Sequence, residues 1–487
     1  INMTQKLNLI KQINPTPYKI FLCIWIVGIC ILCTWPMGLC PIWNGEITGN
    51  QRDQYETMAY SLLEGHLYMD VEVSDELLAM DNPYDTEARE SAHISWRGDH
   101  AFYNGHYYMY FGIVPVIILF LPYLVITGTS LTTYHATQIF TVFIILGFFV
   151  FFDFLRKRFF PTMSRAVYVI VSTGCAMASV WYFVTAPALY CTAISSAVCM
   201  MIWAFYFYFK AVFEDVTFNK KIIYAVFGAL FGALSVGCRP PVAICNLVFI
   251  PLFVIFIQTN EITKKDIKKI IAIFLPYVII VGLIMIYNYV RFDSPFEFGQ
   301  RYQLTLTDQH EYTFFSNIGG IRLLNGINTM FFTSEGLDGE FPYVNFGGIL
   351  PEFPIFAIGI GGLLLSKSVR EKLRANKLLA MANMVLVTLI IITMFEVSMA
   401  PDINERYHSD VYFILAILTF IVIGFMNTEL SGRAKSISSV VFVCFGLLTM
   451  VVSVLMFFIP NDSNYIAVNP VYLDYIRSIM YQVEHIM

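Results

Sequence analysis

The chain has 487 residues, of which 57% are hydrophobic and 16% aromatic, while only 13% carry a charge. With a mean hydropathy of +0.65, this composition excludes an ordinary soluble globular protein and predicts a protein that resides in lipid. The formal net charge of -5 and the lack of any basic tract argue against nucleic acid as a partner.

The N-terminal apolar run, Ile20 to Met37, follows Lys6, Lys11 and Lys19 and so resembles a signal peptide. It is long enough to span a bilayer and lacks a clear small-x-small cleavage site, so we expect an uncleaved first helix. The ten cysteines fall mainly inside apolar runs, with no dense set in a polar loop. They are therefore predicted to be core residues rather than a disulfide framework.

Hydropathy predicts eleven membrane-spanning helices, because eleven apolar stretches approach the roughly 20 residues that cross a bilayer. The expected fold is an all-α polytopic membrane protein, with residues 1–487 forming one transmembrane domain. The eleven stretches are 19–39, 135–155, 164–185, 188–209, 222–237, 242–258, 270–289, 345–365, 378–398, 410–427 and 437–459.

The lysines predict the orientation, because each lies in the N-terminal segment or in alternate loops of the eleven-helix scheme. Basic residues accumulate in cytoplasmic loops, so the N-terminus is expected to be cytoplasmic and the C-terminus extracytoplasmic. The expected location is the plasma (cytoplasmic) membrane, as a multi-pass protein. The lysines are at positions 6, 11, 19, 157, 210, 220, 221, 264, 265, 268, 269, 367, 372, 377 and 435.

One further apolar stretch, Tyr108 to Thr127, does not fit the alternation, because a crossing there would move every later lysine loop to the other side. It contains Pro115 and Pro122 and is predicted to be a re-entrant or interfacial helical piece. The alternative is that it does span and that a weaker segment, 222–237, does not.

The scheme places two large loops outside the membrane, 40–134 and 289–343. The first is acidic, since thirteen carboxylates between Glu46 and Asp99 face only three arginines. It opens with a helical pattern ending at Gly65, which predicts an amphipathic helix lying on the membrane.

The outer loops contain arginine but no lysine. A planar guanidinium at the membrane interface suits bidentate binding of a lipid-borne phosphate. The alternative is that each arginine extends from a helix end to the interface or pairs with a loop carboxylate. The outer arginines are 52, 89, 97, 239, 291, 301, 322, 406 and 477.

Two carboxylates of the first loop are candidates for chemistry. Asp53 stands at the start of the predicted amphipathic helix, where a helix cap is the alternative role. Asp99 lies in a tyrosine-rich stretch, together with His106, Tyr107 and Tyr108. These side chains suit contact with a carbohydrate or a lipid head group, or else form an interfacial aromatic belt.

Other motifs are missing from the sequence. There is no HExxH, Walker loop or GxSxG motif. The predicted spans contain few ionisable residues, among them Asp153 and Glu396 near helix ends. This argues against an ion-coupled transporter, which is expected to bury several such groups at mid-membrane.

Taken together, the pattern resembles the GT-C glycosyltransferases, a class that includes protein O-mannosyltransferases and the enzymes that attach aminoarabinose to lipid A. Asp53-Gln-Tyr-Glu56 resembles their acidic site at the start of the first outer loop. The segments 105–115, 289–299 and 405–408 look like parts of uncharacterised bacterial members. Gln54 stands where a second acid often occurs, which puts a divalent metal site in doubt, and no other cofactor is expected.

The resemblance implies transfer of a sugar from a polyprenyl-phosphate donor to a hydroxyl of a glycan, lipid or protein acceptor outside the membrane. Asp53 would then be the general base, and the arginines would stabilise the leaving lipid phosphate. The site residues implied are Asp53 as catalytic base, with Tyr55, Asp99, His106, Tyr107, Tyr108, Arg239, Arg291, Arg301, Arg406 and Tyr407 binding substrate.

Two other functions remain open. A flippase or transporter for a lipid-linked sugar would also use arginines that bind phosphate, but it leaves the long acidic loop unexplained. A polysaccharide polymerase or ligase also uses outer arginines, although its main outer loop usually comes later in the chain.

Overall fold

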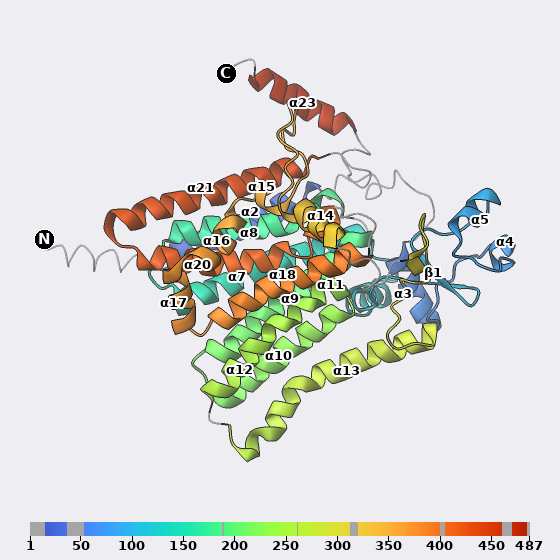
Figure 1. Ribbon diagram of the computed structural model, residues 1–487, viewed down its shortest axis with the longest axis horizontal. Coiled ribbons are helices and arrows are strands. Elements are labelled where there is room, and N and C mark those ends of the chain that lie inside the picture. The colour runs from blue at the N-terminus through green and yellow to red at the C-terminus, as the bar shows by residue number, and fades with distance from the viewer. Residues whose placement is uncertain are drawn as a thin grey trace, which may run out of the picture.

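The computed structural model describes residues 15–36, 53–187, 189–260, 262–311, 320–399, 405–459 and 470–484 as a helical bundle with a lobe at one end (Figure 1). Ten helices of this part are long and apolar enough to cross a membrane, which confirms the predicted all-α polytopic fold class. They are α2 (Pro15–Thr34), α7 (Thr133–Phe159), α8 (Arg165–Thr185), α9 (Leu189–Phe213), α10 (Phe218–Val236), the continuous α11 (Pro240–Ala243), η3 (Ile244–Val248) and α12 (Phe249–Thr259), η4 (Lys264–Asp266) with α13 (Ile267–Phe292), α18 (Leu379–Met399), α19 (Glu405–His408) with α20 (Tyr412–Glu429), and α21 (Gly432–Met456).

The predicted span 345–365 is instead two short helices, α15 (Ile349–Glu352) and α16 (Ile355–Leu365). Pro354 has no N–H to donate and biases Phe353 away from helical geometry, so the helix breaks between them. Eleven residues of α16 rise about 16 Å, roughly half the hydrocarbon thickness. The described part therefore holds ten helices of spanning length where the hydropathy pattern predicts eleven.

The lysines of the described part gather at one end of the bundle, which we call the lysine end. They lie in the α7–α8, α9–α10, α12–α13, α16–α18 and α20–α21 connections, in the helix turns beside them, or near the start of α2. Contacts across these connections hold them together: Lys435 donates to the Thr162 carbonyl at 2.8 Å, and Lys372 lies 3.3 Å from Glu429. The opposite end, which carries the lobe, is the loop end (Figure 1).

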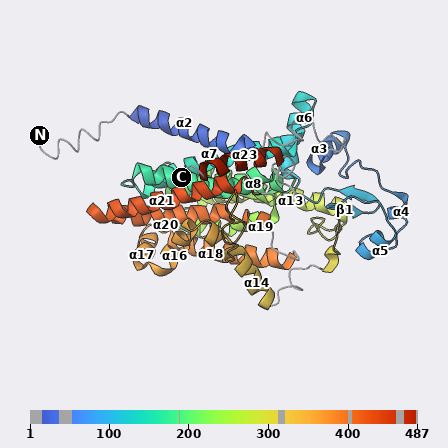
Figure 2. The same ribbon diagram turned by 90° about the horizontal axis from the view of Figure 1, so that it is seen from above.

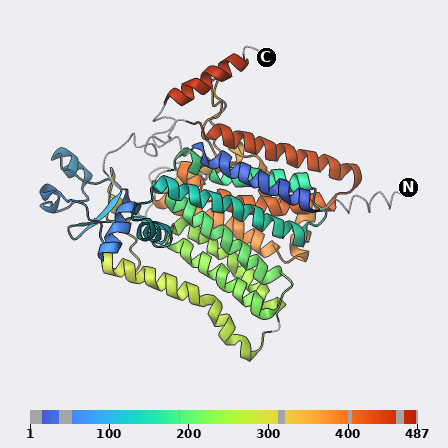
Figure 3. The same cartoon turned by 180° about the vertical axis from the view of Figure 1, so that it is seen from behind.

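The centre of the bundle is formed by α8, α9 and α20, whose apolar side chains are mostly buried. Phe152 of α7 stacks on Phe420 of α20 with ring centroids 4.0 Å apart. α13 packs mainly against α10 and exposes apolar side chains on most of its surface. Figure 3 shows it at the edge of the bundle.

The lobe contains a small antiparallel sheet of three strands in the order β2, β1, β3. A two-residue turn joins β1 to β2, and both turn residues, Asn104 and Gly105, have positive φ, as this hairpin type requires. β3 comes from the second of the two predicted outer loops, so the sheet joins two distant parts of the chain. The lobe elements are α3 (Gln54–Glu64), α4 (Asp75–Leu78), α5 (Thr86–Ser91), β1 (His100–Tyr103), β2 (His106–Tyr108) and β3 (Gln303–Leu304).

The stretch 108–127 ends in a helical piece of twelve residues, η2 (Val116–Phe120) followed by α6 (Leu121–Thr127). Twelve residues rise about 18 Å, less than a full crossing. The piece packs against α3 and projects from one side of the loop end (Figure 2). Its placement in or on a bilayer stays a prediction.

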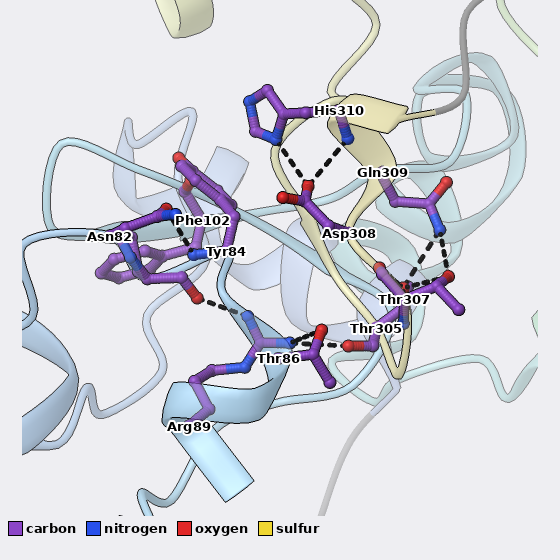
Figure 4. A network of polar contacts seen from close by, with 11 residues as sticks. Asn82, Tyr84, Thr86, Arg89, Phe102, Thr305, Thr307, Asp308, Gln309 and His310 are labelled. Carbon is purple, nitrogen blue, oxygen red and sulfur yellow. Dashed lines mark hydrogen bonds and ion pairs between the residues drawn. The ribbon is translucent and has the colours of Figure 1, made fainter.

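The two predicted outer loops, 40–134 and 289–343, are joined by the buried side chain of Arg89 on α5. Its guanidinium donates to the Pro83 carbonyl, to Thr86 Oγ1 at 3.3 Å and to the Thr305 carbonyl at 2.6 Å, and it lies over the Trp96 ring. Figure 4 shows this network, in which Gln309 in turn donates to Thr305 and Thr307. The segment after β3 is thereby fixed to the first loop.

The remaining helices lie around the bundle. α14 projects from the side opposite α6 (Figure 2). α23 contacts the segment between α14 and α15 through Arg477, whose Nε donates to the Phe341 carbonyl at 3.1 Å. These helices are η5 (Gln309–Glu311), α14 (Gly320–Phe331), α17 (Lys367–Ala375) and α23 (Pro470–Glu484).

Candidate functional site

A cavity of about 850 Å³ lies at the loop end, where the ends of α9, α13, α18 and the α10–α11 turn meet the two outer loops. It combines apolar and aromatic walls with a few charged groups, as ligand sites commonly do. Six of the eleven residues predicted from the sequence line it: Asp99, Arg239, Arg291, Arg301, Arg406 and Tyr407.

Arg239 stands in the α10–α11 turn, where Pro240 and Pro241 start the next helix. It forms a two-pronged ion pair with Asp410: Nε and Nη2 each lie 2.7 Å from a different carboxylate oxygen. Glu396 of α18 lies 3.7 Å from the same Nη2. The positive charge of Arg239 is therefore balanced by carboxylates of the protein, and these contacts fix the guanidinium in the cavity wall.

Arg291, in the last turn of α13, is only 4% exposed, yet no described carboxylate lies within ion-pair distance of it. It donates to the Met109 carbonyl at 2.8 Å and to Asn288 Oδ1 at 2.9 Å, while its Nε has no hydrogen-bond partner. Its guanidinium carbon lies 3.8 Å from the Tyr287 ring centroid. A buried cation without an anionic partner is costly, and an anionic ligand would offset that cost.

Arg406 lies between two aromatic rings, with its guanidinium carbon 4.3 Å from the Tyr190 centroid and 5.2 Å from the Tyr407 centroid. Arg239 also faces the Tyr407 ring, at 6.0 Å. Both guanidinium groups thus lie near the Tyr407 ring, which favours their position in the cavity wall. Within the described residues, neither Arg406 nor the exposed Arg301 is in an ion pair.

Asp99 enters the cavity from the turn before β1, with a positive φ of 57°. A non-glycine residue in this conformation is uncommon and is held by its surroundings. Its carboxylate accepts hydrogen bonds from the Tyr190 hydroxyl and from Gln303 Nε2, the latter at 2.9 Å. Each oxygen thus has one protein donor, which leaves further lone pairs for a substrate hydroxyl.

Four polar residues that position Asp99 and Arg239 are absent from the predicted site residues. Gln303 and Tyr190 hold the Asp99 carboxylate, and Asp410 holds Arg239. Gln54 also belongs here, because its buried amide donates to the Asp99 carbonyl at 2.7 Å. These contacts link residues far apart in the sequence, so spacing along the chain gives no signal for them.

Asp53 and Tyr55 do not line the cavity. Asp53 caps α3 by accepting the N–H groups of Tyr55 and Glu56 at 2.9 and 3.1 Å. Burial raises the pKa of the Asp53 carboxyl, against the opposing effect of hydrogen bonds from Thr133 and these N–H groups. The Tyr55 ring is buried and stacks on Phe120 at 5.3 Å. The cap that the sequence offered as an alternative role for Asp53 is thus present.

His106, Tyr107 and Tyr108 also lie outside the cavity lining, on β2. His106 stacks on Tyr68 at 4.3 Å. The buried Tyr107 hydroxyl accepts the Arg97 N–H at 3.1 Å, and Tyr108 packs edge-on against Phe292. In this structure all three side chains support the lobe and do not face the cavity.

Two glycines let the first loop approach the α10–α11 turn. A Cβ at Gly112 would collide with the carbonyl oxygens of Gly237 and Cys238, and the Val114 N–H donates to the Gly237 carbonyl at 2.9 Å. Both glycines line the cavity, so the wall is closed here by direct backbone contact.

No group of three or more His, Cys, Asp or Glu side chains able to hold a metal ion occurs in the described ranges.

Comparisons with known proteins add little. No family model matches the chain, and no curated protein matches it either. Among solved structures, the crystal structure of the Archaeoglobus fulgidus oligosaccharyltransferase in the apo form matches at 13% sequence identity with a TM-score of 0.43. The match covers 90% of this chain and 57% of that one, so this chain spans little more than half the length of the archaeal protein. A likeness at this level says nothing of activity or substrate.

Proposed function

We propose that the protein is a membrane glycosyltransferase of the GT-C type, which moves a sugar from a polyprenyl-phosphate-linked donor to an acceptor hydroxyl. The observation that carries this proposal is the loop-end cavity, where Arg291, Arg301 and Arg406 lack a described carboxylate partner and the hydrogen-bonded carboxylate of Asp99 lines the same wall. An arginine set suits a phosphate, and a carboxylate suits a hydroxyl.

The donor side of the reaction is assigned to the arginines. As the bond between the anomeric carbon and the phosphate oxygen breaks, negative charge collects on the lipid phosphate, and fixed guanidinium groups stabilise it. The cavity reaches α13 through Ile284, Tyr287 and Arg291. The outer faces of α13 are apolar and exposed, which supports a donor whose tail stays in the bilayer while its phosphate reaches Arg291.

The acceptor side is assigned to a carboxylate of the first loop. It takes the proton of the acceptor hydroxyl as that oxygen attacks the anomeric carbon, and the lipid phosphate leaves as an anion. Asp99 is the candidate that lines the cavity, and Asp53 is the candidate from the sequence resemblance. The raised pKa of Asp53 also suits a general base, so both carboxylates are candidates for this role.

The reaction is assigned to the extracytoplasmic side of the plasma membrane. Support comes from the lysine end of the bundle, because cytoplasmic loops are the ones enriched in lysine. The cavity lies at the opposite end, and the acceptor, whether a glycan, lipid or protein, would approach it from outside the cell.

The test uses the full-length protein in proteoliposomes with a panel of polyprenyl-phosphate-linked monosaccharides. We expect release of polyprenyl phosphate matched by formation of a glycosidic product. Arg291→Gln should raise the KM for the donor at least tenfold, since a hydrogen bond to a charged group contributes roughly 1.5–3 kcal/mol. The matched control is Arg322→Gln, on α14 and outside the cavity, which should stay close to the wild type.

Movement of the lipid-linked sugar across the vesicle membrane without any glycosidic product would overturn the proposal in favour of a flippase. Equal changes in donor KM for Arg291→Gln and Arg322→Gln would show that the cavity does not bind the donor phosphate.

A further inference from the structure

A second cavity, of about 590 Å³, lies at the lysine end, between α12 and the start of α18. We call it the α12–α18 groove. Its walls are apolar except at the end nearest α17, where a glutamine and two basic side chains line it. The lining residues are Ile250, Pro251, Val254, Ile255, Gln258, Arg374, Lys377, Leu379, Ala380 and Met384.

The groove opens on the outer surface of the bundle. Ile250 and Val254, both on the spanning helix α12, are 54% and 46% exposed. From Ile250 to Gln258 the helix rises about 12 Å, so the apolar wall runs from the lysine end toward mid-membrane. A hydrocarbon chain lying there would replace contacts that these side chains otherwise make with bulk lipid.

The two basic residues stand where the apolar wall ends. Arg374 is in the last turn of α17, and Lys377 follows in a left-handed turn, with φ of 61°, that leads into α18. Both are exposed, and neither forms an ion pair with a described carboxylate. The nearby acids are held elsewhere, Glu371 by Lys367 and Glu429 by Lys372.

We infer that the α12–α18 groove binds one phospholipid with an anionic head group, drawn from the leaflet at the lysine end. Its phosphate lies between Arg374 and Lys377, and an acyl chain lies along Ile250, Val254 and Met384. Charge complementarity selects this occupant, because no carboxylate lines the groove and the basic pair stands at the lysine end of its apolar wall. The site is separate from the loop-end cavity and does not depend on the proposed transfer reaction.

Basic residues at this end of a membrane protein also act as general surface charge, and the experiment has to separate the two cases. Lys264 and Lys265 in η4 provide a matched pair, since they lie at the same end, next to a spanning helix, but do not line the groove. An anionic lipid attracted by surface charge alone depends on both pairs equally.

The test measures binding of phosphatidylglycerol and phosphatidylcholine to the purified full-length protein by native mass spectrometry. The wild type is expected to retain phosphatidylglycerol preferentially. The double variant Arg374→Gln, Lys377→Gln should bind it about 25-fold more weakly, since each basic residue near an anionic lipid surface is worth roughly a fivefold factor. The control pair Lys264→Gln, Lys265→Gln should keep the preference.

A third variant, Val254→Trp, fills the groove without changing its charge and should also lose the bound lipid. Size-exclusion profiles establish that each variant is folded. Unchanged phosphatidylglycerol binding in the Arg374 and Lys377 double variant, or an equal loss in the control pair, would overturn the site.

Discussion

The hydroxyl of Tyr190, at the start of α9, donates a hydrogen bond to the carboxylate of Asp99, which lies 91 residues earlier in the lobe. The same Tyr190 ring supports Arg406 on its face. One side chain of the membrane bundle therefore fixes both the carboxylate and a cation of the cavity. Removing only the Tyr190 hydroxyl therefore tests the geometry of the site.

Tyr190→Phe removes the hydroxyl but keeps the ring beneath Arg406. Loss of a hydrogen bond to a charged group costs roughly 1.5–3 kcal/mol, so kcat for sugar transfer should fall about tenfold to a hundredfold. Donor KM should change little, because the ring that supports Arg406 remains. Steady-state kinetics in proteoliposomes separate the two constants, and a change in KM alone would assign Tyr190 to donor binding instead.

Asp99→Asn and Asp53→Asn decide which carboxylate acts as the base. General-base catalysis contributes typically 10²–10⁴-fold, so Asp99→Asn should lower kcat by at least a hundredfold. Asn is a good helix cap, so Asp53→Asn should preserve α3 and the folded protein. If it is the Asp53 variant that loses transfer while Asp99→Asn retains it, the base is Asp53.

Gly112→Ala tests the backbone contact that closes the cavity wall. The added methyl would meet the carbonyl oxygens of Gly237 and Cys238, which cannot move as a flexible side chain does. Overpacking of this kind costs typically 1–3 kcal/mol, and a lower melting temperature with weaker transfer is expected. Gly282→Ala is the control, since a Cβ there has no neighbour within 4 Å. A thermal shift assay in detergent compares the two, and equal melting temperatures would contradict the contact.

Arg89→Met tests the link between the outer loops. The change removes the guanidinium that joins the Pro83 and Thr305 carbonyls while keeping much of the buried volume. We expect faster proteolytic cleavage within the lobe, because its segments lose their common partner. Glu90→Gln, at an exposed site on the same helix, should cleave at the wild-type rate. Identical cleavage of the Arg89 and Glu90 variants would show that the loops are held by other contacts.

Much of this architecture can be predicted from the sequence because it follows from the amino-acid composition of its segments. The asymmetry of lysine and arginine singled out Arg239, Arg291, Arg301 and Arg406, and the structure brings all four to one cavity. Apolar length predicted the spans, but at 345–365 it predicted one continuous helix where Pro354 divides the stretch into two shorter ones.

The rest of the site depends on contacts between distant residues. Asp410 pairs with Arg239 across 171 positions, and Gln303 reaches Asp99 across 204. Tyr190 lies in an apolar run where one more aromatic residue carries no special signal. The hairpin could have been predicted from the sequence, however, because Asn104-Gly105 between aromatic residues is a strong hairpin signal. Because no strand was predicted there, we expected substrate contacts from His106, Tyr107 and Tyr108. The structure instead places these residues in β2.

The pairing of β1 with β3 sets an order on biosynthesis. The lobe emerges from the ribosome soon after the first helix, yet Gln303, Leu304 and Thr305, which complete its sheet and hold Asp99 and Arg89, follow six further helices of spanning length. The first loop therefore lacks β3 and its contacts with Arg89 and Asp99 while those helices enter the membrane. A nascent chain stalled before Gln303 would therefore expose an incomplete lobe.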